Sequence, residues 1–339
     1  MGRKDKALCR YLRKPEVFAD FCNGVIYGGE KRIAARELAE AQEDYSRKKR
    51  GRDGVLRTVT RERDVSKLLC RGPHFVKISV ENQDEISFCM PVRCMEYDEM
   101  DLTGQLCRLR QHYGREKTLR PGAEFLSGMK ETDRLIPVAT VVFYHGEGKW
   151  TAARQLQDML DMEGADEPLK RLVADYRMNV VCLEDLQEEN FETGLREMIA
   201  LMKRRKDKAA FQKYCAEQEE RLGHVDGDTY ELLCAMLNLP VWKKKDNQNE
   251  KREDYNMCVA FQEWMEDEKQ KGIKLGIEQG IEIGEKRGEK RGEKRGEKRG
   301  EKRLGILIEK LVCDGRQEDI LSASRSESAR RKLYLEYDI

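Results

Sequence analysis

The chain has 339 residues, which is enough for one large domain and an appendage. Charged residues make up 38% of the sequence, yet 65 Lys and Arg almost balance 64 Asp and Glu, and the formal net charge is +1. This balance excludes a polycationic chain, so any surface for nucleic acid has to come from local segregation of charge, with modest and salt-sensitive affinity.

The first 60 residues predict a basic arm, two helices and a strand. Residues 1–14 are rich in Lys and Arg and predict a frayed arm that either meets phosphates or is simply solvated. Residues 15–23 predict a short helix and residues 33–45 a second one. After a polar loop over residues 46–54, we expect the first strand of a sheet at residues 55–60.

Two strand-like runs, residues 64–70 and 75–80, predict a β-hairpin. Apolar and polar side chains alternate along the second run, which is typical of a strand with one buried face. The residues between the two runs, Arg71-Gly72-Pro73-His74, are typical of a turn. A hairpin centred between Gly72 and Pro73 places Asp64 directly opposite Glu81, with Cβ atoms about 4.5–5.5 Å apart.

The open end of this hairpin is a candidate metal site. Asp64 and Glu81 repel each other unless a positive charge lies between them, and Gln83 projects from the same face as Glu81. A hard divalent cation such as Mg²⁺ prefers oxygen ligands of this kind, and it activates water against a phosphodiester. The alternative is a hairpin whose acidic ends are only solvated.

Several short motifs in this order resemble one protein family, the Rpn family of recombination-promoting nucleases. These proteins are also classed as transposases and lie within the PD-(D/E)XK nuclease superfamily. The resemblance covers roughly residues 15–205. The motifs that carry it are Arg63-Asp64-Val65, Val80–Gln83, Met90–Arg93, Tyr97-Asp98, Leu135–Val138 and Val142–Gly146.

The resemblance implies a fold, an activity and a set of site residues. The fold would be an α/β, restriction-endonuclease-like (PD-(D/E)XK) core with a mixed central sheet flanked by helices. Asp64 and Glu81 would bind Mg²⁺ or Mn²⁺, and Gln83 would take the catalytic place where many superfamily members carry lysine. The activity would be that of a metal-dependent DNA endonuclease that promotes recombination or transposition. On the first helix of the family, Asp20 and Asn23 are candidates to reach the metal.

A long helix is predicted after the hairpin, from residue 90 to about residue 113, with Pro91 in its first turn. Arg93 and Tyr97 lie four residues apart and therefore on one face, where they contact DNA phosphates, support the site or merely pack. Arg108 and Arg110 begin a basic cluster that is either the phosphate-contacting patch of the core or a solvated face.

The remaining elements of the core are two strands and several helices. Residues 136–144 form the most apolar run and predict a central strand buried on both faces, closed by His145, which either assists the chemistry or bonds to backbone. Another strand is expected at residues 180–183. Helices are expected at residues 150–159, 191–206, 209–222, 229–239 and 255–271.

The last part of the chain is repetitive, with eight tetrads over residues 272–303, of which the last five read GEKR. In a helix, four-residue spacing stacks like charges at i,i+4, and each glycine costs about 1 kcal/mol relative to alanine. The repeat therefore predicts a marginal helix or a charged flexible spacer. An apolar helix follows it, and residues 317–337 predict one or two short helices.

These elements divide the chain into five segments, and the functional alternatives stay open. No zinc-type cysteine spacing and no 18-residue apolar run is present, so we expect a cytoplasmic protein without membrane contact. The family resemblance implies DNA as the partner, and whether the chain forms a homo-oligomer stays open. The alternatives to a nuclease are a catalytically weak DNA- or partner-binding protein with the same fold, and an oligomeric scaffold. The segments are a basic arm (1–14), the nuclease-like domain with a helical extension (15–240), a linker and helix (241–271), the tetrad repeat (272–303) and a small helical region (304–339).

Overall fold

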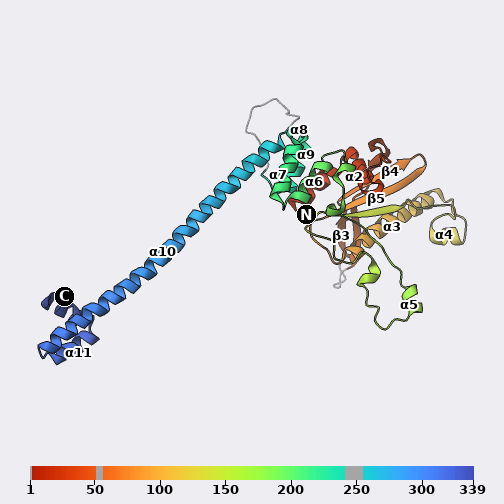
Figure 1. Cartoon of the computed structure of the whole chain (residues 1–339). Coiled ribbons are helices and arrows are strands. Elements are labelled where there is room, and N and C mark those ends of the chain that lie inside the picture. The colour runs from red at the N-terminus through yellow and green to blue at the C-terminus, as the bar shows by residue number, and fades with distance from the viewer. Residues whose placement is uncertain (1, 51–55, 241–254) are drawn as a thin grey trace. The chain divides into compact units, whose positions relative to one another are not determined.

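The computed structural model describes residues 2–50, 56–240 and 255–339 (Figure 1). The chain divides into two compact units, Met1–Gln262 and Glu263–Ile339. The first unit holds the predicted hairpin and all the strands of the described chain.

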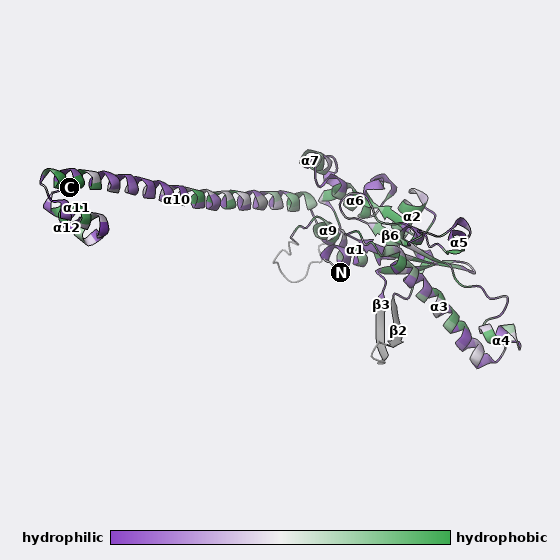
Figure 2. Cartoon of the chain, turned by 90° about the horizontal axis from the view of Figure 1, so that it is seen from below, coloured by the Kyte–Doolittle hydropathy of each residue, from purple (hydrophilic) through white to green (hydrophobic). Residues whose placement is uncertain are grey.

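A mixed five-stranded sheet with the order β1-β4-β5-β6-β7 forms the centre of the first unit. Strands β1 (Leu38–Glu40), β4 (Val65–Arg71) and β5 (His74–Gln83) are antiparallel neighbours, whereas β6 (Val138–Tyr144) and β7 (Asn179–Cys182) continue the sheet in parallel. Strand β5 is therefore central, and the predicted α/β class with a mixed sheet is confirmed. The predictions of a buried central strand in β6 and of a strand at β7 are also confirmed (Figure 2).

The β4–β5 hairpin has the predicted register. Val65 pairs with Val80 and Arg71 with His74, and continuing this register places Asp64 opposite Glu81. The sequence predicted one buried face for this hairpin. Both faces are buried instead, because helices cover both faces of the sheet. Ser66 and Ser79 are fully buried, and their hydroxyl oxygens lie 2.8 Å apart in a hydrogen bond.

Three helices cover the two faces of the sheet. Helix α3 (Met90–Glu116) is the crossover between β5 and β6, and it lies on the face that carries Glu81. Helices α1 (Arg3–Leu12) and α2 (Pro15–Tyr27) lie on the opposite face, where the α2 ring of Phe21 meets that of Phe143 edge-on at 5.3 Å. Most of the expected basic arm is thus the ordered helix α1, because its apolar side chains bury against the sheet and against α9 (Gly227–Met236).

Three other segments differ from the predicted elements. The helix expected at residues 33–45 is replaced by a 3₁₀ turn, η1 (Ala35–Glu37), by β1 and by the start of β2 (Asp44–Arg50), because β1 pairs with the edge of β4. The strand expected at residues 55–60 is β3 (Leu56–Glu62), but it pairs with β2 in a separate two-stranded sheet, and Val55 lies outside the described residues. At residues 150–159 the chain forms only a 3₁₀ helix, η2 (Leu156–Met159).

The rest of the first unit is helical, as predicted for the extension. Helix α6 (Leu195–Arg204) buries Leu195, Met198 and Leu201 completely, so its apolar side chains form the core beneath the extension. The tyrosine hydroxyl of Tyr11 lies 2.9 Å from the hydroxyl of Thr229, which joins α1 to α9. The remaining elements are α4 (Ala123–Ser127), α5 (Glu167–Leu172), η3 (Leu183–Asp185), η4 (Glu188–Asn190), α6 (Leu195–Arg204), α7 (Lys208–Glu217), α8 (Glu219–Gly223) and α9 (Gly227–Met236).

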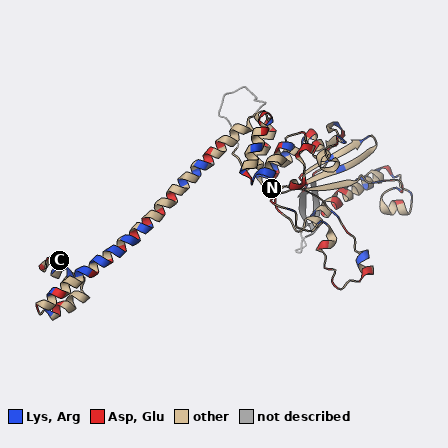
Figure 3. Ribbon diagram, in the orientation of Figure 1, with Lys and Arg blue, Asp and Glu red and all other residues tan. Residues whose placement is uncertain are grey.

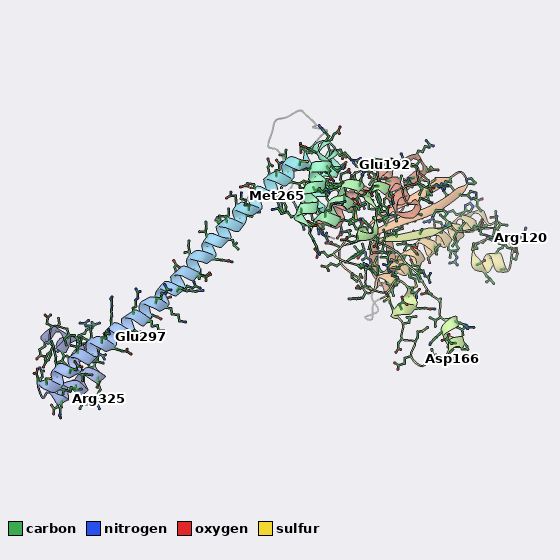
Figure 4. The ribbon with its side chains drawn as sticks, in the orientation of Figure 1. Arg120, Asp166, Glu192, Met265, Glu297 and Arg325 are labelled. Carbon is green, nitrogen blue, oxygen red and sulfur yellow. The ribbon has the colours of Figure 1, made fainter. Side chains whose placement is uncertain are left out.

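The tetrad repeat is helical throughout, within α10 (Met257–Cys313). Basic and acidic side chains alternate along this helix (Figure 3), and every side chain from residue 269 to residue 303 is exposed, Glu297 among them (Figure 4). The helical alternative is therefore the one observed, while its marginal stability stays a prediction. Most of the expected linker, residues 241–254, lies outside the described residues.

A small helical cluster closes the second unit, as the sequence predicted. After a turn at Gly315, with φ of 66°, helices α11 (Gln317–Arg325) and α12 (Glu327–Glu336) fold back and bury Leu307, Leu311 and Leu333. Within the described parts of the chain, no helix combines the length and apolarity needed to cross a membrane.

We expect the chain truncated after Gln270 to fold with the thermal midpoint of the first unit unchanged, because the removed side chains are exposed or belong to the second unit. Differential scanning fluorimetry of both forms is the measurement.

A peptide of residues 272–303 should show little helix by circular dichroism at low salt. A truncated chain that unfolds well below the first transition of the full chain would contradict the first expectation, and a strongly helical peptide the second.

Candidate functional site

The candidate site is built on the carboxylates of Asp64 and Glu81, where the β4–β5 hairpin opens. Both side chains are buried, with exposed fractions of 5% for Asp64 and 0% for Glu81. The backbone N–H of Asn82 donates to Asp64 Oδ2 at 2.7 Å. Among the described residues, Glu81 Oε1 has no hydrogen-bond partner. Both carboxyl groups are therefore buried where the hairpin opens, and the charge of Asp64 acts on Glu81.

The pKa values of both carboxyl groups lie above their ordinary range. Burial, followed by the charge of Asp64, raises the pKa of Glu81 to about 8. Burial is also the main cause that raises the pKa of Asp64. The two carboxyl groups thus form an acidic pair whose ionisation costs free energy, and a bound cation would stabilise their ionised form.

Two arginines flank Glu81 and offset part of this charge. Arg93 Nη2 on α3 lies 3.4 Å from Glu81 Oε2, and Arg63 Nη1 lies 3.8 Å from Glu81 Oε1. The side chain of Arg93 is 35% exposed, whereas that of Arg63 is fully buried. Arg93 is therefore a cation at this site that solvent and a ligand can reach.

Tyr97 lies between the two arginines rather than at the surface. Its ring centroid is 5.1 Å from the Arg63 guanidinium and 5.6 Å from that of Arg93, which is cation–π geometry. Its hydroxyl donates to the Glu62 carbonyl oxygen at 3.2 Å. Of the roles considered for Tyr97, these contacts fit support of the site, because only 4% of the residue is exposed.

A buried ionic network centred on Arg63 was not recognised from the sequence. Arg63 Nη2 lies 2.7 Å from Asp98 Oδ1 and 3.0 Å from Asp101 Oδ2, and Nη1 donates to Thr140 Oγ1 at 2.8 Å. Asp98 also accepts hydrogen bonds of 2.6 Å from Thr140 and from Tyr176. Two features of the sequence could have indicated this network. Arg63 is adjacent to Asp64, and Asp98 and Asp101 lie three residues apart on one helix face.

The other predicted residues are spread over a wider area. Gln83 donates from Nε2 to the Asn82 carbonyl oxygen at 2.6 Å and is half-buried, two residues beyond Glu81 on the same strand. Arg108 and Arg110 lie 15 and 17 residues beyond Arg93 on α3, which is about 22–25 Å along the helix axis. Those two exposed arginines are therefore not part of the carboxylate site.

The side chains of Asp20 and Asn23 on α2 make hydrogen bonds to backbone groups and are not directed at a metal. Asp20 accepts hydrogen bonds from the backbone N–H groups of Glu192 and Thr193. Asn23 donates to the Ile33 carbonyl oxygen and accepts from the Ile33 N–H. Because these bonds occupy their polar atoms, the interpretation of either residue as a metal candidate is wrong.

The carboxylate pair fits a hard cation better than a soft one. Asp64 and Glu81 supply oxygen donors only, and Glu81 Oε1 is buried without a partner among the described residues. The described residues contain no cluster of three or more His, Cys, Asp or Glu side chains arranged to hold a metal. A cation at this pair would therefore complete its coordination with water, as Mg²⁺ commonly does.

The sheet, the crossover helix and the acidic pair define a class, namely an α/β protein with a candidate acidic site on its central hairpin. Residues 124–225 match a family model described as "Putative transposase, YhgA-like". This match confirms the resemblance to YhgA-like transposases and supports a function related to transposition. Comparisons with curated proteins and with solved structures found no match. The matched segment contains β6, β7 and α6, so the assignment of Asp64 and Glu81 stays a prediction.

Proposed function

We propose that this protein is a metal-dependent DNA endonuclease that hydrolyses phosphodiester bonds and so promotes recombination or transposition. The observation that carries this proposal is the pair of buried carboxylates, Asp64 and Glu81, opposite each other on the central hairpin. The order of elements, with antiparallel β4 and β5, crossover helix α3 and parallel β6, is compatible with a restriction-endonuclease-like (PD-(D/E)XK) core. The family match supports DNA as the substrate.

Each residue of the site has a role that follows from its position. Asp64 and Glu81 would hold Mg²⁺ or Mn²⁺, which supplies charge stabilisation at the phosphate and lowers the pKa of water. Arg93 is partly exposed beside Glu81 and can bind a non-bridging phosphate oxygen of the DNA strand. Arg63 orients Glu81 from the buried side, and the Gln83 amide can orient water without adding charge.

The proposal is tested with supercoiled plasmid DNA and the purified full chain. We expect nicked and linear products with Mg²⁺ or Mn²⁺, and intact plasmid with EDTA. Cleavage that persists in EDTA, or no cleavage with either metal at several protein concentrations, would contradict a metal-dependent nuclease.

A second function, DNA binding with weak or no catalysis, is favoured by two specific observations. Gln83 stands where many members of the superfamily carry lysine, and the raised pKa of Glu81 leaves this carboxyl group mostly protonated at neutral pH. This alternative predicts DNA binding in a filter or mobility-shift assay without products in the plasmid assay.

Metal binding should depend on pH through Glu81. Because the pKa of Glu81 is raised to about 8, a cation has to displace a proton below that pH. We expect the apparent affinity for Mn²⁺ to rise about tenfold per pH unit between pH 6 and 8, measured by calorimetry or by the thermal shift. Glu81→Gln should abolish this slope.

The folding stability of the metal-free protein should fall as pH rises, which is opposite to the trend of metal affinity. A carboxyl group whose folded-state pKa is raised binds more protons in the folded state, so its stability contribution is complete below the unfolded pKa of about 4.3 and is lost as pH rises to about 8.

Metal affinity that is equal at pH 6 and pH 8 would show that Glu81 is not a ligand.

Gln83→Lys should preserve or raise cleavage. The lysine would add a positive charge at the position where many superfamily members carry one, and Gln83 is half-buried, so that an ammonium group can reach solvent. Initial rates at saturating Mg²⁺ are the measurement, with Gln83→Met as the uncharged control of similar length. A loss of activity in Gln83→Lys, with the fold and metal affinity intact, would show that this site needs the neutral amide.

A further inference from the structure

Two arginines that solvent can reach flank the acidic pair from opposite faces of the sheet. Arg13 follows the last turn of α1, and its Nη2 lies 3.5 Å from the Asp64 carbonyl oxygen. Arg93 Nη2 on α3 lies 3.4 Å from Glu81 Oε2. The side chains of Arg13 and Arg93 are 47% and 35% exposed. A polyanion at the acidic pair would therefore meet a cation on each side.

An ion pair with Glu43 positions Arg13 without enclosing it. Arg13 Nη2 lies 2.8 Å from Glu43 Oε2, and Glu43 Oε1 accepts a hydrogen bond of 3.0 Å from the Ser66 N–H. Glu43 is therefore fixed to the start of β4, next to Asp64. A guanidinium carries five N–H donors, so Arg13 can keep its contact with Glu43 and still bind a phosphate oxygen.

An exposed phenylalanine lies in the loop that leads from the site to α3. Phe88 follows the end of β5 by five residues, and 76% of it is exposed. The residues around it are anchored, because Ile86 packs against the core cluster that contains Met90, and the Met90 N–H donates to the Ser87 carbonyl oxygen at 3.2 Å. The loop therefore holds the Phe88 ring toward solvent instead of burying it.

The start of α3 brings Phe88 close to Arg93. Cys89 is the N-cap of this helix, so Phe88 occupies the position before the cap and Arg93 the fourth position of the helix. Side chains at these two positions are neighbours at a helix start, where they often pack against each other. The Arg93 N–H donates to the Cys89 carbonyl oxygen at 3.1 Å, which closes the turn between them. An aromatic ring and a cation thus lie together beside Glu81.

A free aromatic face favours a base whose own face is free. In an intact duplex each base stacks on its neighbours, whereas in a single strand or a melted segment a base can stack on an aromatic side chain. Every base has a π-face, so this contact tolerates any sequence. Arginine contacts to phosphates carry no such preference, because both forms of DNA have the phosphate backbone. The Phe88 ring would therefore add a preference for DNA with an unpaired base.

We propose that the site takes a DNA strand with an unpaired base next to the cleaved phosphate, with Arg13 and Arg93 on its backbone and Phe88 stacked on that base. All three are then substrate-binding residues. This inference rests on the proposed function, because it places the phosphate at the acidic pair, but the binding itself can be measured without cleavage.

The preference for an unpaired base is tested by fluorescence anisotropy of the full chain with labelled oligonucleotides in EDTA. The probes are a single strand of about 20 nucleotides and the duplex of the same sequence, in about 50 mM KCl. In Phe88→Ala we expect the affinity for the single strand to fall about 5- to 100-fold, and the affinity for the duplex to change by no more than about twofold. Phe125→Ala, at a 72% exposed position on α4, is the matched control and should bind as the wild type does.

Two further variants separate stacking from apolar contact. Phe88→Trp should keep or raise the affinity for the single strand, whereas Phe88→Leu should weaken it about as much as Phe88→Ala does, because leucine has no π-face. All three variants should unfold at the wild-type temperature, since the position is exposed. Equal affinity of wild type and Phe88→Ala for the single strand, or an equal loss on single strand and duplex, would overturn the stacking.

The backbone contact of Arg13 is tested by the salt dependence of binding. Arg13→Gln should weaken the binding of single strand and duplex alike, and should lower the slope of log K against log[KCl] by about 0.7–0.9 in magnitude, the contribution of one phosphate contact. Arg10→Gln, one turn earlier on α1, is the matched control, because Arg10 is also paired with a glutamate, Glu231. A slope that is identical in wild type and Arg13→Gln would overturn the role of Arg13.

The result for the unpaired base is separate from the result for the nuclease. A wild type that prefers the single strand through Phe88 but leaves plasmid intact in Mg²⁺ would count against the nuclease alone. A wild type that cleaves plasmid, while Phe88→Ala and Phe125→Ala bind the single strand equally well, would overturn the unpaired base alone. A wild type that binds no single strand at low salt would also overturn it.

Discussion

Asp64→Asn and Glu81→Gln should each lower metal-dependent plasmid cleavage by on the order of 100-fold or more, while the protein stays folded. Each change keeps the shape of the side chain and removes one of the two negative charges that would hold the cation. A loss of about 3 kcal/mol of transition-state stabilisation corresponds to this factor. The measurement is the initial rate of nicking at saturating Mg²⁺.

The metal-free stability of these two variants should be equal to or above that of the wild type. Both carboxyl groups have pKa values raised by burial, and each carboxylate adds to the cost of ionising the other, so an amide removes an unfavourable charge. Glu85→Gln, at an exposed position four residues beyond Glu81, is the matched control and should cleave normally. Undiminished cleavage by Asp64→Asn or Glu81→Gln would remove that residue from the site.

Arg63→Met should lower the free energy of unfolding by about 3–5 kcal/mol, the largest stability effect that we expect from one substitution in this chain. Methionine fills much of the same volume, but the partly buried Asp98 and the buried Asp101 lose the guanidinium that lies 2.7 and 3.0 Å from them. The measurement is the urea midpoint of the full chain, followed by the far-ultraviolet signal of the first unit. Arg110→Met, at an exposed position on α3, should change the unfolding free energy by no more than about 0.5 kcal/mol.

A second substitution separates loss of packing from loss of charge compensation. Asp98→Asn in the Arg63→Met background removes the carboxylate that lost its guanidinium partner and should recover part of the lost stability, whereas Asp101 keeps Lys77 Nζ at 2.7 Å from its Oδ1. In the wild-type background the same Asp98→Asn change should be destabilising, because Asp98 accepts from Arg63, Thr140 and Tyr176. If Arg63→Met and Arg110→Met are equally stable, the buried network does not contribute to stability in the way described.

The amino-acid sequence by itself was sufficient for the elements whose signals are local. Alternation and a Gly-Pro turn predicted the β4–β5 hairpin and its register, and hence the opposition of Asp64 and Glu81. Pro91 marked the start of α3, and an uncharged apolar run marked β6. Within each of these elements the pattern and the fold agree, since the same few neighbouring residues determine both.

The tertiary structure decided what depends on partners distant in the chain. The segment at residues 33–45 has helical composition but pairs with the edge of β4, and the basic residues at the N-terminus belong to a helix that packs on the sheet. The Arg63 network joins residues 35 to 78 positions apart, and the His145 ring lies within 3.6 Å of carboxylates on α1 and directly after β5. The sequence pattern does not predict such pairs, because it does not indicate whether water or a buried counter-ion will stabilise the charge of a given side chain. That choice is made only when the sheet brings the partners together.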